Sequence, residues 1–244
     1  MLVCTIAVVN SQTLPNIQTS SVYLTDLKID GLASELKDKF QAYNKATDVF
    51  YTISNDQNNL YFTLRVKYPD VISRLLLGGI TLSLNHSKIK KDTTALSITF
   101  PFAEAGDRGK ISNAFSRARN KKNEIGEVSM SVEELNAVLK SVTKTIKVTG
   151  LSGVVTPAIS IYNDAGIRAA VLFTQELFYT YELSVPLTLL NLPNKGLDPF
   201  SYHLKMNAPF EGSSLKQGGP PPPPMEVSTA AATDFWGLYK LAKL

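Results

Sequence analysis

The chain is poor in the residues that carry most enzymatic and metal chemistry. Of its 244 residues, one is cysteine, two are histidine and one is tryptophan. Cys4 has no partner for an intramolecular disulfide, which excludes a disulfide-stapled fold. The motifs of serine hydrolases, zinc peptidases and phosphate-binding loops are missing from the sequence. We therefore expect a protein without enzymatic activity, with an unrecognised hydrolase built on paired carboxylates as the alternative.

Long hydrophobic runs and a strong charge of one sign are missing as well. No run approaches the ~18 apolar residues of a membrane-spanning helix. The 25 basic and 21 acidic residues leave a net charge of +4, a bias too small to indicate a nucleic-acid partner. Hydrophobic residues make up 44% of the chain, which is enough for a sizeable buried core. We expect a globular protein with no transmembrane segment and no nucleic-acid partner.

The first residues form an apolar run from Leu2 to Val9, which the polar stretch Asn10 to Thr13 follows. This pattern is typical of the end of a secretory signal peptide, so we interpret residues 1–13 as a truncated signal segment. Export would place the protein in the periplasm, on the outer-membrane surface or outside the cell. The alternatives are that the run is a first buried strand and that the protein is cytoplasmic.

Alternation of apolar and polar residues is the strongest structural signal in the sequence. It recurs in runs that each have one apolar and one wettable face, at 60–67, 80–85, 96–100 and 180–187. Half-buried antiparallel strands have this pattern. About seven or eight strands are expected, which predicts an all-β fold, an immunoglobulin-like antiparallel β-sandwich over residues 22–212.

Turn-forming residues separate several of these runs. Asn55–Asn59 predicts a hairpin between a strand at 49–54 and the strand at 60–67. Asn163–Gly166 predicts a second hairpin, between strands on either side of it.

Helices are predicted in only two short segments. Residues Ser131 to Glu134 form a capping box, and an apolar stripe follows it over 132–142. A second helix is predicted at Asp70–Leu77, between a proline and two glycines. The polar and basic segment 104–127 predicts a long loop between strands.

The C-terminal part of the chain predicts a linker and a tail. Two glycines and five prolines lie within 213–232, which predicts a stiff spacer. The tail at 233–244 contains Phe235, Trp236 and Tyr239, which would be costly to leave in water. Either the tail docks on the sandwich, or these three side chains bind a partner.

Four segments along the chain carry a resemblance to a known family. They are Leu27–Gly31 with an acidic residue shortly after, Asn55–Val66, Gly78–Leu82 and Tyr181–Pro186. Their order and content resemble the carbohydrate-binding family 9 and DOMON-like domains, over roughly Leu27 to Leu190. The resemblance implies a β-sandwich and a carbohydrate ligand. Sugar-binding members stack their ligand between tryptophans, whereas the one tryptophan here, Trp236, lies outside these segments.

Candidate binding residues follow from the alternation and from the resemblance. Tyr61, Thr63 and Arg65 fall on the wettable face of one strand, where a ring, a hydroxyl and a cation suit contact with a glycan or another protein. The alternative is a wetted sheet face, or one covered by the helix at 132–142. The resemblance also implies a structural calcium held by Asp30 and Asp56, with support of two turns as the alternative. No other cofactor is expected.

These patterns together predict an exported bacterial β-sandwich that acts as a non-catalytic binding or interaction module. Its expected partner is a carbohydrate or a protein of the cell envelope. The alternative is a structural or assembly protein of the envelope that acts through its C-terminal tail.

Overall fold

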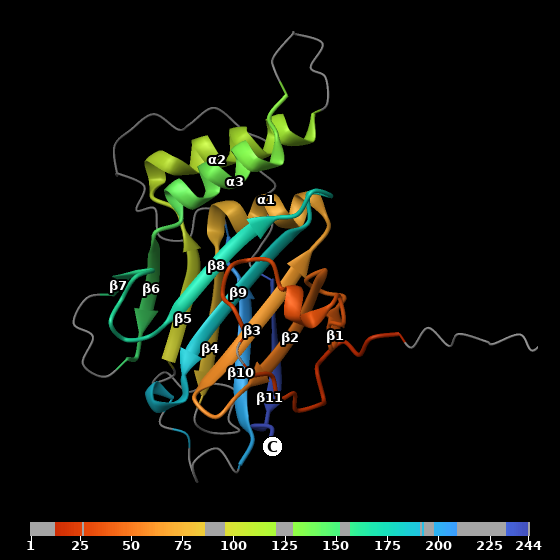
Figure 1. Cartoon of the computed structure of the whole chain (residues 1–244), viewed down its shortest axis with the longest axis vertical. Coiled ribbons are helices and arrows are strands. Elements are labelled where there is room, and N and C mark those ends of the chain that lie inside the picture. The colour runs from red at the N-terminus through yellow and green to blue at the C-terminus, as the bar shows by residue number, and fades with distance from the viewer. Residues whose placement is uncertain are drawn as a thin grey trace, which may run out of the picture.

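Two antiparallel sheets face each other in this protein, and three helices gather at one end of them (Figure 1). The computed structural model describes residues 13–25, 27–85, 96–120, 129–151, 157–190, 192, 198–208 and 233–243. Within these ranges the chain is mostly β, which confirms the prediction of an all-β sandwich. Residues 1–12 of the suspected signal segment and the whole proline-rich linker at 213–232 lie outside the described residues.

The strands divide into a five-stranded sheet, here called sheet A, and a six-stranded sheet, sheet B. In spatial order, sheet A contains β1 (Ala42–Asn44), β2 (Val49–Asn55), β3 (Asn59–Val66), β9 (Tyr179–Pro186) and β8 (Arg168–Phe173). Sheet B contains β11 (Thr233–Tyr239), β10 (Phe200–Met206), β4 (Ile80–Asn85), β5 (Leu96–Phe102), β6 (Thr145–Thr149) and β7 (Ala158–Ser160). The hairpin predicted at Asn55–Asn59 is confirmed, because β2 and β3 pair antiparallel on either side of it.

The turn at 163–166 does not close a hairpin, which corrects the sequence-based prediction. It connects β7, at the edge of sheet B, to β8, at the edge of sheet A. The Asn163 side chain accounts for the crossing, because its amide nitrogen donates hydrogen bonds to the carbonyls of both Ser160 and Ile167, at 2.8 Å each. These bonds fix a turn that leads from one sheet to the other.

The core lies between the sheets and is rich in aromatic rings. Tyr51 of β2 and Tyr202 of β10 are fully buried, and their hydroxyl oxygens lie 2.9 Å apart. A buried tyrosine hydroxyl needs a partner, and here each sheet supplies one to the other. The Tyr51 ring also lies 5.0 Å from the ring of Phe235, between centroids. This cluster joins the two sheets near the C-terminal strand.

Two helices match their sequence-based predictions. Helix α1 (Pro69–Gly78) begins at the predicted proline and ends before Gly79, whose φ of 72° suits a glycine. Helix α3 (Val132–Val142) has the predicted capping box: the Glu134 amide donates to the Ser131 hydroxyl at 3.1 Å, and the Ser131 amide donates to the Glu134 carboxylate at 2.8 Å. None of the helices in the described part of the chain is both long and apolar enough to cross a membrane.

Helix α2 (Ala105–Arg119) stands where the sequence predicts a loop over 104–127. Its buried side chains are few, namely Ile111, Ala114 and Phe115, which recur at the spacing of a helix face. The remaining positions are mainly polar or basic, so the apolar stripe is too sparse to stand out in the sequence. Residues 121–127 of that predicted loop lie outside the described residues.

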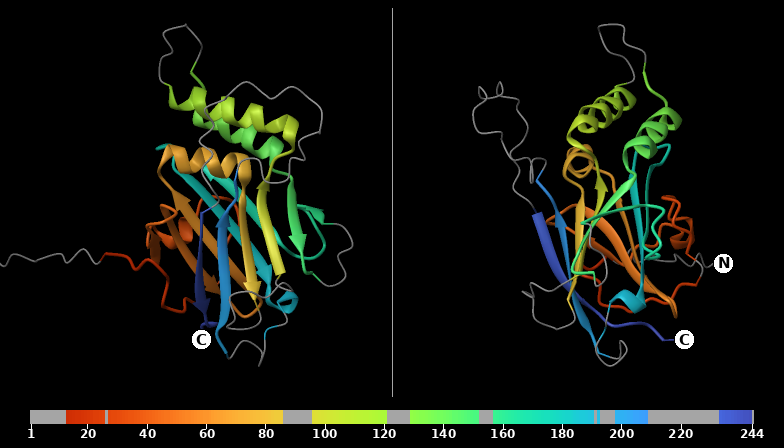
Figure 2. Two further views of the ribbon diagram at one scale, coloured as in Figure 1. Left: turned by 180° about the vertical axis from the view of Figure 1, so that it is seen from behind. Right: turned by 90° about the vertical axis from the view of Figure 1, so that its left-hand side faces the viewer.

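The outer face of sheet A is covered by the segment 27–40 (Figure 2, right panel). Its attachment depends on Glu182 of β9, a fully buried side chain. Glu182 Oε2 accepts hydrogen bonds from the amides of Asp30 at 3.0 Å and Gly31 at 2.6 Å. A side chain at Gly31 would collide with Leu172 of β8, so a glycine lets the segment approach the sheet closely. Strand β9 is therefore buried on both faces.

The C-terminal strand closes the sandwich. Strand β11 pairs with β10 along its whole length, and the chain beyond it crosses toward sheet A (Figure 2, right panel). The Tyr239 hydroxyl oxygen lies within hydrogen-bond distance of two acceptors, the Val22 carbonyl at 3.1 Å and Asn55 Oδ1 at 2.9 Å. The Asn55 side chain in turn binds the backbone of Ala242 through two hydrogen bonds. The predicted tail is thus docked as part of sheet B and also holds the N-terminal segment.

Substitution of Gly237 tests this docking. A Cβ at Gly237 would overlap the ring of the buried Tyr202, so Gly237→Ala is expected to lower the free energy of unfolding by about 1 to 3 kcal/mol. Leu238→Ala changes the neighbouring side chain, which is 51% exposed, and is expected to stay within about 0.5 kcal/mol of the wild type. Urea unfolding measures both. Equal stability of the Gly237→Ala protein and the wild type would contradict the docked strand.

Glu182 makes stability depend on pH. Burial raises the pKa of Glu182 to about 7 from its ordinary 4.5, although the two amide hydrogen bonds act in the opposite direction. The folded protein therefore binds this proton more tightly than the unfolded chain. Below pH 4.5 the proton on Glu182 stabilises the folded protein in full. This stabilisation is lost as pH rises through about 7, and the free energy of unfolding falls by up to roughly 3 kcal/mol.

Glu182→Gln is expected to remove this pH-dependent loss of stability. In urea titrations, the free energy of unfolding of the variant relative to that of the wild type should therefore increase between pH 5 and pH 8.5. Glu104→Gln changes an exposed carboxylate and serves as the control, which should follow the wild-type profile. A Glu182→Gln protein that loses stability with pH as steeply as the wild type would show that Glu182 does not hold the proton.

Candidate functional site

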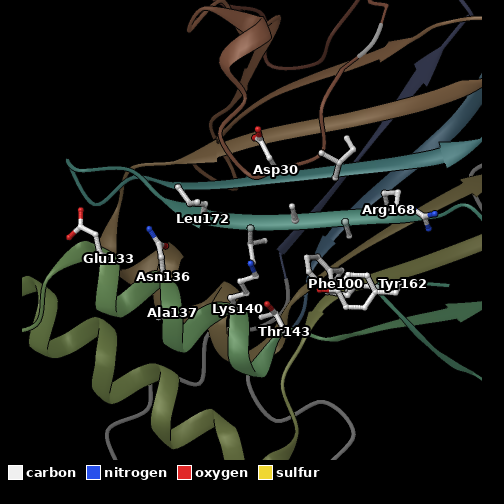
Figure 3. Close-up of a pocket in the computed structure, with 15 residues that line it drawn as sticks. Asp30, Phe100, Glu133, Asn136, Ala137, Lys140, Thr143, Tyr162, Arg168 and Leu172 are labelled. Carbon is white, nitrogen blue, oxygen red and sulfur yellow. The ribbon is translucent and has the colours of Figure 1, made fainter.

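A groove opens beside β8, between the edges of the two sheets and helix α3 (Figure 3). Its volume is about 680 Å³. Strand β8 contributes Ala169 and Val171, helix α3 contributes Asn136 and Lys140, and the turn after β7 contributes Tyr162. The groove thus collects residues from both sheets and from a helix, at an edge where sheet A has no further strand among the described residues.

Among the strands that the structure describes, β8 pairs with β9 alone. In an antiparallel ladder, alternate residues direct both their N–H and C=O toward the neighbouring strand, and the residues between them direct both groups away. Phe173 directs both of its groups away from β9, because they bind a side chain of helix α3. By alternation Ala169 and Val171 do the same, and both line the groove.

Two asparagine side chains cap the ends of this edge. At one end, the Phe173 amide donates to Asn136 Oδ1 at 2.8 Å, and Asn136 Nδ2 donates to the Phe173 carbonyl at 2.9 Å. At the other end, the Ile167 amide donates to Asn163 Oδ1 at 3.3 Å, and Asn163 Nδ2 donates to the Ile167 carbonyl at 2.8 Å. Each side-chain amide takes the place that a neighbouring peptide group would have in a sheet.

Between these caps the edge is open. Within the ranges that the structure describes, no hydrogen bond reaches the outward N–H or C=O of Ala169 or Val171. Both residues are half-buried, so their polar groups lie at the groove rather than on a flat surface. We call the stretch from Arg168 to Leu172 the open edge.

The groove has an apolar interior and a polar rim. Phe100 of β5 and Ile161 contribute apolar surface, and Phe100 is fully buried. Tyr162 stands at the rim and is 78% exposed. Lys140 extends from α3 toward β8 (Figure 3) and has no hydrogen bond or ion pair within the described part of the chain.

The other charged groups of the groove are already engaged. Arg168 Nη1 donates to the carbonyls of Asn163 at 2.9 Å and Ile167 at 3.3 Å. The Glu133 carboxylate accepts a bond from Gln175 at 2.7 Å, which lowers its pKa. Asp30 Oδ1 accepts from the Leu32 amide at 2.9 Å. Lys140 is therefore the charge in the groove that is most available to a ligand.

The structure places the predicted ligand-binding residues away from this groove and covers two of them. Tyr61 and Thr63 are buried, because the segment 27–40 packs over the outer face of sheet A. The Tyr61 hydroxyl donates to the Asp56 carboxylate at 2.5 Å. Arg65 forms an ion pair with Asp38. The expectation of an exposed face at Tyr61, Thr63 and Arg65 was wrong, since alternation shows which residues share a face but not what covers it.

The predicted partner-binding residues belong to β11. Phe235 and Tyr239 are buried against the core, whereas Trp236 is half-buried on the outer face of sheet B. The Trp236 ring stacks on His203, with centroids 4.2 Å apart and planes 8° apart. His203 Nε2 also lies 3.3 Å from the Asp234 carboxylate. These contacts hold β11 to β10.

The two acids suggested for calcium both support turns. Asp30 Oδ1 binds the Leu32 amide, and Asp56 Oδ1 accepts from the amides of Asn58 at 2.7 Å and Asn59 at 2.6 Å. Among the residues described, no group of three His, Cys, Asp or Glu side chains lies close enough to hold a metal ion. Calcium binding by Asp30 and Asp56 stays a prediction without a ligand cluster to carry it.

Sequence reasoning missed the groove because its parts are individually unremarkable. Ala169, Val171 and Lys140 fit an ordinary strand and an ordinary helix surface. A partial signal was present in Asn136, a polar residue on the flank of the apolar stripe of helix 132–142. The capping role of Asn136 depends on the position of β8 in the fold, and local sequence patterns do not predict that position.

No protein-family model matches the chain, and no curated protein matches it. The function must therefore be argued from the site itself.

Removal of the Asn136 cap tests the geometry of the groove. Asn136→Ala leaves the N–H and C=O of the buried Phe173 without their partner, and the free energy of unfolding should fall by about 1 to 3 kcal/mol. Lys140→Ala, an exposed change on the same helix, should remain within about 0.5 kcal/mol. Urea unfolding compares the two. An equal effect of the two substitutions would contradict the capping role of Asn136.

Proposed function

We propose that this protein is a non-catalytic binding module that holds a polypeptide partner in the groove beside β8. The observation that carries the proposal is the open edge, where backbone N–H and C=O groups face a concave apolar site. Ligand sites in proteins are concave, mostly apolar and provided with a few directed polar groups, and this groove has all three properties.

A polypeptide suits the groove better than a small polar ligand does. Its backbone offers donors and acceptors at the spacing of a sheet edge, and its side chains can fill apolar space beside Phe100 and Ile161. Among the described residues, no competing partner occupies the outward groups of Ala169 and Val171. Binding would therefore satisfy polar groups and bury apolar surface together.

A carbohydrate is the second candidate ligand. It is supported by Tyr162, a residue that is 78% exposed and lines the groove at its rim. A flat aromatic face grips the C–H face of a sugar ring, which is the mode implied by the resemblance to carbohydrate-binding family 9 and DOMON-like domains. The proposal also includes the cellular location: the protein is exported, and its partner belongs to the cell envelope.

Filling the groove tests the polypeptide proposal. Random 12-residue peptides are selected on the wild-type protein from a displayed library, and the affinities of the synthetic peptides are measured by fluorescence polarisation. Ala137→Trp places a large ring in the groove and is expected to weaken binding at least about tenfold. Ser141→Trp adds the same ring to an exposed position of α3 that does not line the groove, and should bind as the wild type does. Equal affinities for the two variants would contradict the proposal.

A thermal-shift screen against soluble glycans, with and without calcium, tests the second candidate. A glycan at 100 times its dissociation constant should stabilise the protein by about 2.7 kcal/mol. Tyr162→Ala should abolish this glycan-induced stabilisation if the sugar stacks on the Tyr162 ring. No shift with any glycan would remove carbohydrate as a ligand class, and a rise that survives Tyr162→Ala would place the sugar elsewhere.

A further inference from the structure

The backbone and charged groups around the open edge indicate how a partner binds and which kind of side chain the partner has. We infer that the partner adds to sheet A as an extended strand beside β8, and that it places an acidic side chain against Lys140. This inference rests on the proposed function, because it assigns the binding mode and the partner class of the same groove.

The backbone of the open edge supports strand addition. Ala169 and Val171 together offer two N–H donors and two C=O acceptors in one row, directed away from β9. An extended peptide matches this row, because its own donors and acceptors repeat every second residue. The asparagine caps at Ile167 and Phe173 limit the row at both ends. A segment of about five residues fits between them, at ~3.3 Å per residue.

The middle of the open edge has little protection of its own against strand pairing. Proteins usually guard an edge strand with a proline, a charge, a bulge or a covering segment. The middle of the open edge is Ala169-Ala170-Val171, which has none of the first three, and β8 pairs with β9 without a register shift. At the opposite edge of sheet A, the Tyr43 amide of β1 donates to the Pro15 carbonyl at 2.9 Å, so a segment of the chain covers that edge.

The charge on Lys140 supports an acidic partner. Lys140 extends into the groove toward the open edge, while Arg168, Glu133 and Asp30 each bind groups of the protein itself (Figure 3). An acidic side chain on the added strand would form an ion pair with Lys140 without breaking an existing bond. A basic side chain there would be repelled. The groove therefore selects an extended segment with an acidic residue.

An N-methylation scan of a selected peptide tests strand addition. Each methyl group removes one backbone donor and leaves the side chains unchanged. Methylation of every second residue over a stretch of about five should weaken binding at least about tenfold, and methylation of the residues between them should have a much smaller effect. Val171→Pro provides the matching change in the protein, since it removes an N–H that points away from β9. It should weaken binding at least about tenfold while the thermal midpoint confirms that the variant folds.

Charge reversal tests the acidic residue. The selected peptides should contain Glu or Asp at a fixed position, and replacement of that residue by Gln should weaken binding to the wild type about three- to tenfold. Lys140→Glu, a surface change on α3, should reverse the preference, so that the Lys version of the peptide binds it better than the Glu version. Peptides that bind the wild type and Lys140→Glu equally would overturn the acidic assignment.

The outcomes separate this inference from the proposed function. Binding that Ala137→Trp abolishes but that shows no alternation in the N-methylation scan overturns strand addition and leaves the groove as the site. Binding that Ala137→Trp does not affect overturns both. Sedimentation of the wild-type protein tests whether a second copy of the chain occupies the open edge. A stable dimer that Val171→Pro dissociates would show that β8 of the second copy pairs with this edge, and would overturn the inferred partner.

Discussion

The paired hydrogen bonds between the Asn136 side chain and the Phe173 backbone are the interaction on which the site depends. They fasten helix α3 to the edge of sheet A and give the last outward-facing residue of β8 the partners that a neighbouring strand would supply. Asn163 does the same for Ile167 at the other end. Because a buried backbone polar group is costly without a partner, these caps stabilise the ends of β8 while the stretch between them stays available. The groove is a consequence of this arrangement.

The rest of the fold supplies a rigid support for that edge. Glu182 holds the segment 27–40 on the outer face of sheet A by two backbone amides, and it is neighbour in the ladder to Ala170 of the open edge. At the far side of the molecule, Tyr239 and Asn55 tie the C-terminal strand to the N-terminal segment. Both faces of β9 are buried as a result. Strand addition needs an edge that is fixed before the partner arrives, because preorganisation lowers the cost of binding.

Much of the fold could be predicted from the sequence, and the site could not. Alternation located the strands β3, β4, β5 and β9, and the Ser131–Glu134 capping box and the proline before Asp70 located two helices, because these signals act within a few residues. Helix α2 was missed since only Ile111, Ala114 and Phe115 mark its buried face. Tyr61 and Thr63 were assigned to an exposed face because the covering segment is distant in the sequence. The open edge depends on strand order, on the crossing at Asn163 and on the reach of Asn136, all of which are tertiary.

Amide hydrogen exchange of β8 in the free protein tests the central claim most directly. The amides of Ala169 and Val171 should exchange about a hundredfold faster than those of Ala170 and Leu172, which face β9, and faster than those of Ile167 and Phe173, which the asparagines cap. Addition of a peptide selected on the groove should slow exchange at Ala169 and Val171 in particular. Slow exchange at these two residues in the free protein would show that the edge already has a partner, and would contradict the account.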